Sequence, residues 1–182
     1  RVAASDGVVT TFGEVDVMVS GAVLNPLVPP YGQEWKDRAL GVGASGPDTE
    51  PAADFNNDGR SNVIDFAFQI ETMTAGDAAE KLPAAHIHTI GEDSYFAIQL
   101  RRIEGGSGDL SDNGYEIYGI RYFVECRTGL GSGGWATDPL DMEIVGTPVS
   151  NGDGTETVTV RLKDSMDSDA QEFMRVRVEI LP

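Results

Sequence analysis

Six short runs of strand-forming residues fill the part of the chain after Pro83, and turn residues separate them. The runs lie at 85–90, 94–103, 116–126, 142–149, 156–162 and 172–180. Asn-Gly-Asp-Gly at 151–154, between two alternating runs, is typical of a β-hairpin turn. Short strands at this spacing predict a mainly β chain, with an antiparallel β-sandwich or a barrel-like relative of it over residues 83–182.

Residues 33–82 carry helix signals on both sides of an acidic loop. The stretch 33–40 has a helix-compatible composition, and after Asn62 the apolar residues recur at helical spacing. The recurring residues are Val63, Phe66, Ala67, Ile70 and Met73. Gly76 and then Pro83 are expected to end this second helix. The sequence therefore predicts a helix–loop–helix unit ahead of the β domain.

The N-terminal residues 1–21 form a third part. Polar and apolar residues alternate from 14 to 20, which is the pattern of a half-buried strand. A strand or hairpin of this size needs a sheet to pair with. We therefore expect an N-terminal strand or hairpin without a partner of its own, followed by a proline-rich extended linker at 22–32.

The acidic loop has the spacing of a calcium site. Oxygen-bearing side chains occupy positions 1, 3, 5, 9 and 12 of a twelve-residue stretch, and Gly59 at position 6 permits the sharp turn. The predicted ligands are Asp54, Asn56, Asp58, the Arg60 carbonyl, Asn62 (directly or through water) and Asp65. The alternative is an acidic surface turn rich in Asp and Asn. Because the spacing, the glycine and the following helix agree, we predict that the loop binds Ca²⁺.

This loop departs from the usual pattern in two ways. Position 12 is Asp65, where the pattern has the longer glutamate, so closure of the site requires the helix to come nearer. Position 8 is Ser61, where an apolar residue is usual, so the loop need not pair with a second one. No second stretch of this spacing exists in the sequence.

Charge and composition exclude several classes of partner. The chain has 182 residues and a net charge of −17, which repels nucleic-acid phosphates and anionic lipid. No apolar run approaches the ~18 residues that a membrane-spanning helix needs. One cysteine, Cys126, excludes an internal disulfide and a multi-cysteine zinc site. We expect no nucleic-acid partner and no membrane insertion.

No catalytic constellation is recognisable, so the chain is predicted not to be an enzyme. His86 and His88 share one strand face but lack an obvious third zinc ligand. Cys126 ends an apolar strand and is expected to be a buried, inert thiol. A platform for stacking on sugars is conceivable from four aromatic residues, although core packing explains them equally well. These are Tyr115, Tyr118, Tyr122 and Trp135.

The loop and its helix resemble one half of a dockerin repeat, whose pattern Asp-x-Asn-x-Asp-Gly-x-x-Asn-x-x-Asp matches residues 54–65. Dockerins carry two such repeats and bind cohesins, whereas this chain has one. A wider resemblance, over about residues 31–182, is to the C-terminal region of large secreted proteins from planctomycete and verrucomicrobial bacteria. The matching features are Tyr-x-x-Trp-Lys-like residues 31–36, the acidic loop, Arg101-Arg102, Trp135 and the closing segment from Asn151.

Residues 1–21 resemble the last hairpin of an immunoglobulin- or cadherin-like domain. Together the resemblances imply a secreted bacterial protein that is extracellular or at the cell surface. We expect a non-catalytic, calcium-stabilised structural module that joins neighbouring modules or self-assembles by donating its N-terminal strand. The alternative is a carbohydrate-binding or accessory module of a secreted polysaccharide-degrading protein.

Overall fold

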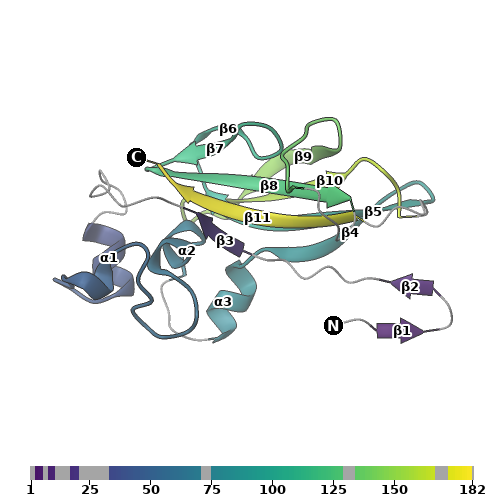
Figure 1. Ribbon diagram of the computed structural model, residues 1–182. Helices are drawn as coiled ribbons and strands as arrows, with labels where there is room; N and C mark the ends of the chain where they lie inside the picture. The colour runs from purple at the N-terminus through teal and green to yellow at the C-terminus, as the bar shows by residue number, and fades with distance from the viewer. Residues whose placement is uncertain are drawn as a thin grey trace.

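Two β-sheets that share one hydrophobic core dominate the computed structural model of the chain (Figure 1). The structure describes residues 3–5, 8–10, 17–20, 33–70, 75–128, 134–166 and 172–181. The strands are β1 Ala3–Ser5, β2 Val8–Thr10, β3 Val17–Ser20, β4 Ala84–Ile90, β5 Asp93–Ile103, β6 Ser107–Asp109, β7 Gly114–Ile117, β8 Ile120–Thr128, β9 Met142–Ser150, β10 Thr155–Leu162 and β11 Glu172–Ile180. The helices are α1 Gln33–Ala39, η1 Pro47–Thr49, α2 Asn62–Ala67 and α3 Ala75–Lys81.

The strands from β3 to β11 form a four-stranded and a five-stranded sheet. The first has the order β4-β5-β10-β9 and is antiparallel throughout. The second has the order β3-β11-β8-β7-β6 and is antiparallel except where β3 runs parallel to β11. Among the described residues, β1 and β2 pair with each other in a separate two-stranded sheet. The predicted mainly β character is confirmed, and the two sheets with a common core are consistent with the predicted sandwich.

The core forms because alternate residues along adjacent strands of each sheet are apolar. Val158 and Val160 on β10 lie beside Leu100 and Ile98 on β5, and all four are buried. On the other sheet, the buried residues of β11 alternate with arginines and glutamates that face outward. Each fully buried aliphatic side chain of this size contributes about 1.5–3 kcal/mol to folding. Because apolar and charged residues alternate along β11, a single orientation of this strand places its apolar side chains in the core.

Two hairpin turns show where local sequence decides the fold. The predicted turn at 151–154 joins β9 to β10, as expected. The predicted strand 116–126, in contrast, is divided into β7 and β8 by a two-residue turn. In that turn Tyr118 and Gly119 both have positive φ, 53° and 78°, which is the type I′ geometry that suits a tight hairpin.

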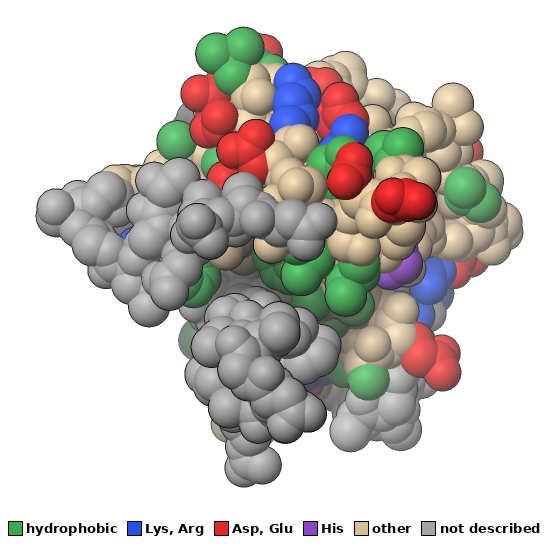
Figure 2. Space-filling view, turned by 90° about the vertical axis from the view of Figure 1, so that its right-hand side faces the viewer, with side chains coloured by type: hydrophobic (Ala, Val, Ile, Leu, Met, Phe, Trp, Pro, Cys, Tyr) green, Lys and Arg blue, Asp and Glu red, His purple; other side chains and the backbone are tan. Residues whose placement is uncertain are grey.

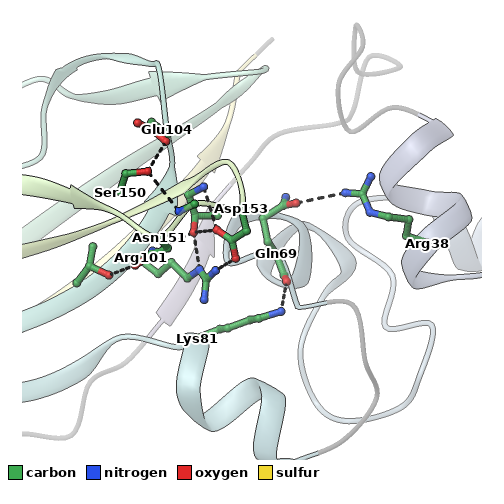
Figure 3. A network of polar contacts seen from close by, with 11 residues as sticks. Arg38, Gln69, Lys81, Arg101, Glu104, Ser150, Asn151 and Asp153 are labelled. Carbon is green, nitrogen blue, oxygen red and sulfur yellow. Dashed lines mark hydrogen bonds and ion pairs between the residues drawn. The ribbon is translucent and has the colours of Figure 1, made fainter.

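Arg101 of β5 holds the β9–β10 turn (Figure 3). Arg101 contacts Asp153 and donates a hydrogen bond to the Thr155 hydroxyl, with Nε 2.7 Å from Oγ1. Partial burial raises the pKa of Asp153, but hydrogen bonds from Thr155 and Arg101 outweigh it and leave this pKa below its usual range. Arg102 pairs with Glu156, with Nε 2.6 Å from Oε1. The two arginines of β5 and the segment from Asn151 therefore meet through two separate ion pairs.

The helix predicted after Asn62 is shorter than its apolar pattern suggested. α2 ends at Ala67 because Gln69 adopts a left-handed conformation, with φ 52°. The Ile70 amide then donates to the Asp65 carbonyl (2.8 Å), and the Gln69 amide donates to the Phe66 carbonyl (3.1 Å). This is the hydrogen-bond pattern of a Schellman cap. Met73 lies outside the described residues.

The second half of the predicted helix begins again as α3, which includes Gly76, the residue expected to terminate it. The three α-helices lie together on one side of the sheets (Figure 1). None of the helices in the described part of the chain is long and apolar enough to cross a membrane.

The N-terminal strand pairs differently from the prediction. It was expected to have no partner within the chain, but β3 lies along the edge of β11 in parallel. A parallel pair cannot be closed by a tight turn, and these two strands stand at opposite ends of the sequence. No local pattern announces such a pairing. The predicted linker at 22–32 lies outside the described residues.

Candidate metal loop and its supporting core

The acidic loop 54–65 winds around its own side-chain oxygens. Asp54 accepts the amide hydrogens of Asp58 and Gly59, at 3.1 and 2.9 Å from its two oxygens. Asp58 in turn accepts the amide hydrogen of Arg60 at 2.9 Å. Gly59 has φ +88°, the left-handed conformation that the position-6 glycine was predicted to supply. The side chains at positions 1 and 5 therefore point toward the inside of the turn.

The Arg60 side chain connects the two ends of the loop. Its Nε lies 3.0 Å from Oδ1 of Asp65, and its Nη2 pairs with Asp58. Burial raises the pKa of Asp65, while the hydrogen bond and the charge of Arg60 act in the opposite direction. The single positive charge of this guanidinium thus offsets part of the negative charge of the two carboxylates. It lies between the same two side chains that were predicted to hold a cation.

The Asn62 side chain makes structural hydrogen bonds that the ligand pattern did not predict. Its side-chain amide donates to the carbonyls of Asp48 and Glu50, both at 2.8 Å, and accepts from the Phe55 amide at 3.1 Å. The residue is 1% exposed. Asn62 therefore ties the acidic loop to the segment around η1, and any role as a ligand would compete with these bonds.

The donor set of the loop fits a hard cation. Side-chain oxygens of Asp54, Asn56, Asp58 and Asp65, together with the Arg60 carbonyl, offer oxygen atoms only, which suits Ca²⁺ and not a soft metal. Within the described residues, however, no three His, Cys, Asp or Glu side chains lie together as a metal-holding group. Calcium binding by this loop stays a prediction, and it requires the carboxylates to converge further than they do here.

Directly behind the loop, α2 is part of the hydrophobic core. Every residue from 62 to 68 is buried. The Tyr122 hydroxyl of β8 donates to the Ala67 carbonyl at the end of α2, with an O···O distance of 2.6 Å. The rings of Phe68 and Tyr122 meet edge to face at 6.2 Å, and Trp35 of α1 meets Phe66 in the same way at 5.6 Å. The last residue of the loop, Asp65, therefore belongs to a helix that the sheets hold firmly.

Replacing Tyr122 with phenylalanine should lower the free energy of unfolding by about 1–3 kcal/mol. The reason is that the Ala67 carbonyl loses its buried donor while the ring packing is retained. Urea denaturation measures this effect. Tyr118→Phe, at an exposed turn residue, is the control and should change the free energy by less than about 0.5 kcal/mol. Equal values for the two variants would show that the hydroxyl does not link α2 to the sheet.

The four aromatic residues considered for sugar stacking do not form one exposed platform. Tyr115 and Tyr122 are buried in the core, whereas Tyr118 is exposed in the β7–β8 turn. Trp135 is half-buried, and the guanidinium groups of Arg127 and Arg175 lie 5.2 and 4.4 Å from its ring centroid. Tyr115 and Tyr122 therefore contribute to core packing, and of the three tyrosines only Tyr118 is exposed.

Arg175 also belongs to a buried ion-pair cluster on the outer face of the five-stranded sheet. The Nε atoms of Arg175 and Arg177 lie 2.6 and 2.9 Å from the two carboxylate oxygens of Glu125. Arg177 covers the Phe123 ring at 3.9 Å. These arginines are therefore used in holding β8 and β11 together.

The other candidate groups show no catalytic arrangement among the described residues. His86 and His88 lie on the exposed strand β4, and Figure 2 shows a histidine (purple) beside a gathering of apolar side chains (green). The large exposed hydrophobic residues of β4 are Ile87 and Ile90. Burial, followed by the nearby acidic residues, raises the pKa of the Cys126 thiol to about 11, so it is protonated and unreactive at neutral pH.

No protein family, curated protein or solved structure matches the chain. The resemblances to dockerin repeats and to the C-terminal regions of secreted bacterial proteins therefore remain predictions.

Proposed function

We propose that the chain is a non-catalytic, calcium-stabilised structural module of an extracellular or cell-surface protein. The observation that supports this most is the position of α2. Its first turn supplies Asp65 to the acidic loop, while its last turn carries the Ala67 carbonyl that Tyr122 binds. A cation that fixes Asp65 would therefore restrain the helix and, through it, the core. Loops of this type bind Ca²⁺ at about 10⁻⁴–10⁻³ M in extracellular modules, where that concentration is available.

The charge of the chain supports the same proposal. With a net charge of −17, the folded state is destabilised by self-repulsion, and bound cations would relieve part of it. Melting curves of the chain in millimolar CaCl₂ and in chelator test the proposal. It predicts a higher melting temperature in calcium, and equal temperatures would contradict it.

Arg60→Ala should bind Ca²⁺ about tenfold more tightly than the parent chain, because the guanidinium no longer competes for Asp58 and Asp65. The substitution leaves the Arg60 carbonyl, a predicted ligand, in place. Isothermal titration calorimetry measures the affinity. Lys163→Ala removes one positive charge at an exposed residue outside the loop and is the matched control. Affinity that is unchanged or weaker in Arg60→Ala would contradict competition at this site.

The proposed role includes assembly with other copies or with neighbouring modules. Size-exclusion chromatography with light scattering, in calcium and in chelator, tests assembly. A glycan-binding role is the alternative from another class, and its best remaining element is Trp135. Affinity electrophoresis on algal and plant glycans discriminates the two roles: retardation that Trp135→Ala abolishes would favour the alternative.

A further inference from the structure

The edge of β11 that carries β3 is the part of the fold where one copy can most readily engage another. β3 is paired with β11 in parallel over four residues, with Val17 opposite Val176 and Val19 opposite Val178. β3 is also the outermost strand of its sheet and contacts α2. This short strand is therefore all that covers the edge of β11 among the described residues.

The register explains why this edge needs a cover. Val176 and Val178 are fully buried and belong to the core, so the in-register positions 17 and 19 fall on the same face of the sheet. Met18 and Ser20 fall on the outer face, opposite Arg177 and Glu179. Without β3, β11 would present a row of unpaired amide and carbonyl groups beside apolar side chains. Such an edge is a template for pairing with another chain.

Nothing in the pairing requires the covering strand to come from the same molecule. No tight turn joins β3 to β11, since the rest of the fold separates them in sequence. Twelve residues separate β3 from α1, and a stretch of that length spans up to roughly 40 Å when fully extended. The same strand in the same register makes the same contacts in either case. Whether β11 pairs with β3 of its own chain or of a second copy is then set by the effective concentration of each strand, since the contacts are the same.

We propose that β11 is the acceptor edge for β3 of a second copy of this chain, in the register that Val17–Val176 pairing defines. The inference rests on the proposed function, in which copies assemble, and it names the surface and the partner. Each copy donates one strand and accepts one, so a reciprocal exchange closes as a dimer, whereas a head-to-tail exchange that does not close continues into a filament. Because each copy carries a large negative charge, exchange needs salt or calcium to screen the repulsion.

Disulfide trapping between two full-length variants tests the proposal. Ser20 and Glu179 are directly paired, and cysteines on adjacent paired strands lie within the Cα separation that a disulfide spans. Ser20→Cys and Glu179→Cys chains are mixed at high concentration in calcium and physiological salt, then oxidised. Glu172→Cys replaces Glu179→Cys in the control, because Glu172 lies on the same strand beyond the reach of β3. The parent chain, with only the buried Cys126, is the second control.

The proposal predicts a disulfide-linked heterodimer of the Ser20→Cys and Glu179→Cys chains, at least about tenfold more abundant than with the Glu172→Cys control. Its yield should rise with protein concentration. Heterodimer no more abundant than the control, while the double variant closes only within its own chain, would overturn the proposal. Large species by light scattering without this heterodimer would also overturn it, although assembly by another surface would stand. The calcium-dependent melting temperature is measured separately. A failure of strand exchange can therefore be told apart from a failure of calcium stabilisation.

Discussion

The Asp58→Asn variant is expected to melt about 5–10 °C below the parent chain in about 10 mM calcium, and within about 2 °C of it in chelator. With a dissociation constant of about 10⁻⁴ M, this calcium concentration is about a hundredfold excess, and binding at that excess contributes about 2.7 kcal/mol to the free energy of unfolding. For a domain of this size, 1 kcal/mol corresponds to roughly 2–4 °C. In chelator little is lost, because an exposed pair such as Asp58–Arg60 contributes about 0–1 kcal/mol.

Asp112→Asn is the matched control for this experiment. Asp112 is an exposed residue between β6 and β7, so the variant has the same net charge as Asp58→Asn but an intact loop. It should melt with the parent chain in both conditions. If calcium stabilised the chain only by screening its negative charge, both variants would respond alike. Equal melting temperatures of Asp58→Asn and the parent chain in calcium would rule out the loop as the site.

The Glu156→Gln variant is expected to lose about 3–5 kcal/mol of unfolding free energy, because it removes the partner of a buried charge. Arg102 is 6% exposed and lies over the Tyr115 ring, with Cζ 3.5 Å from the ring centroid. Its Nε pairs with Glu156, whereas its Nη1 is buried and has no hydrogen-bond partner among the described groups. Glu156 therefore supplies the negative charge that compensates the buried positive charge of Arg102. Urea denaturation at neutral pH measures the loss.

Glu143→Gln provides the comparison within the same sheet. Glu143 pairs with Arg161, but its side chain is 43% exposed, so its loss should cost no more than about 1 kcal/mol. A double variant, Arg102→Met with Glu156→Met, should recover much of the stability, because it removes both buried charges together. A loss below about 1 kcal/mol in Glu156→Gln would mean that the pair does not stabilise the end of the core.

Strand positions were predictable from the sequence because strand alternation and turn residues are local signals. β5, β9, β10 and β11 lie within a residue of their predicted runs. The β7–β8 turn was missed because tyrosine is not a typical turn residue, and Gly119 alone is a weak signal. The end of α2 was missed for a related reason. Gln69 takes a conformation that glycine usually supplies, and the Schellman bonds show this only in three dimensions.

Contacts between distant segments were beyond the reach of local patterns. The parallel pairing of β3 with β11 joins the two ends of the chain, and no periodicity encodes it. Asn62 was recognised by its place in a ligand pattern, yet its partners are backbone carbonyls of the preceding loop. Tyr122 was considered for sugar binding, because a sequence does not distinguish a core tyrosine from an exposed one. In each case the missing information was the identity of the neighbours.

Amide hydrogen exchange of the parent chain, with and without calcium, tests the central claim most directly. We propose that calcium bound by residues 54–65 stabilises the core through α2 and Tyr122. The proposal predicts that calcium slows exchange in the loop, in α2 and in β8 together, as one cooperative unit. Exchange that slows in the loop alone would contradict the coupling, and exchange that calcium leaves unchanged throughout would contradict the site itself.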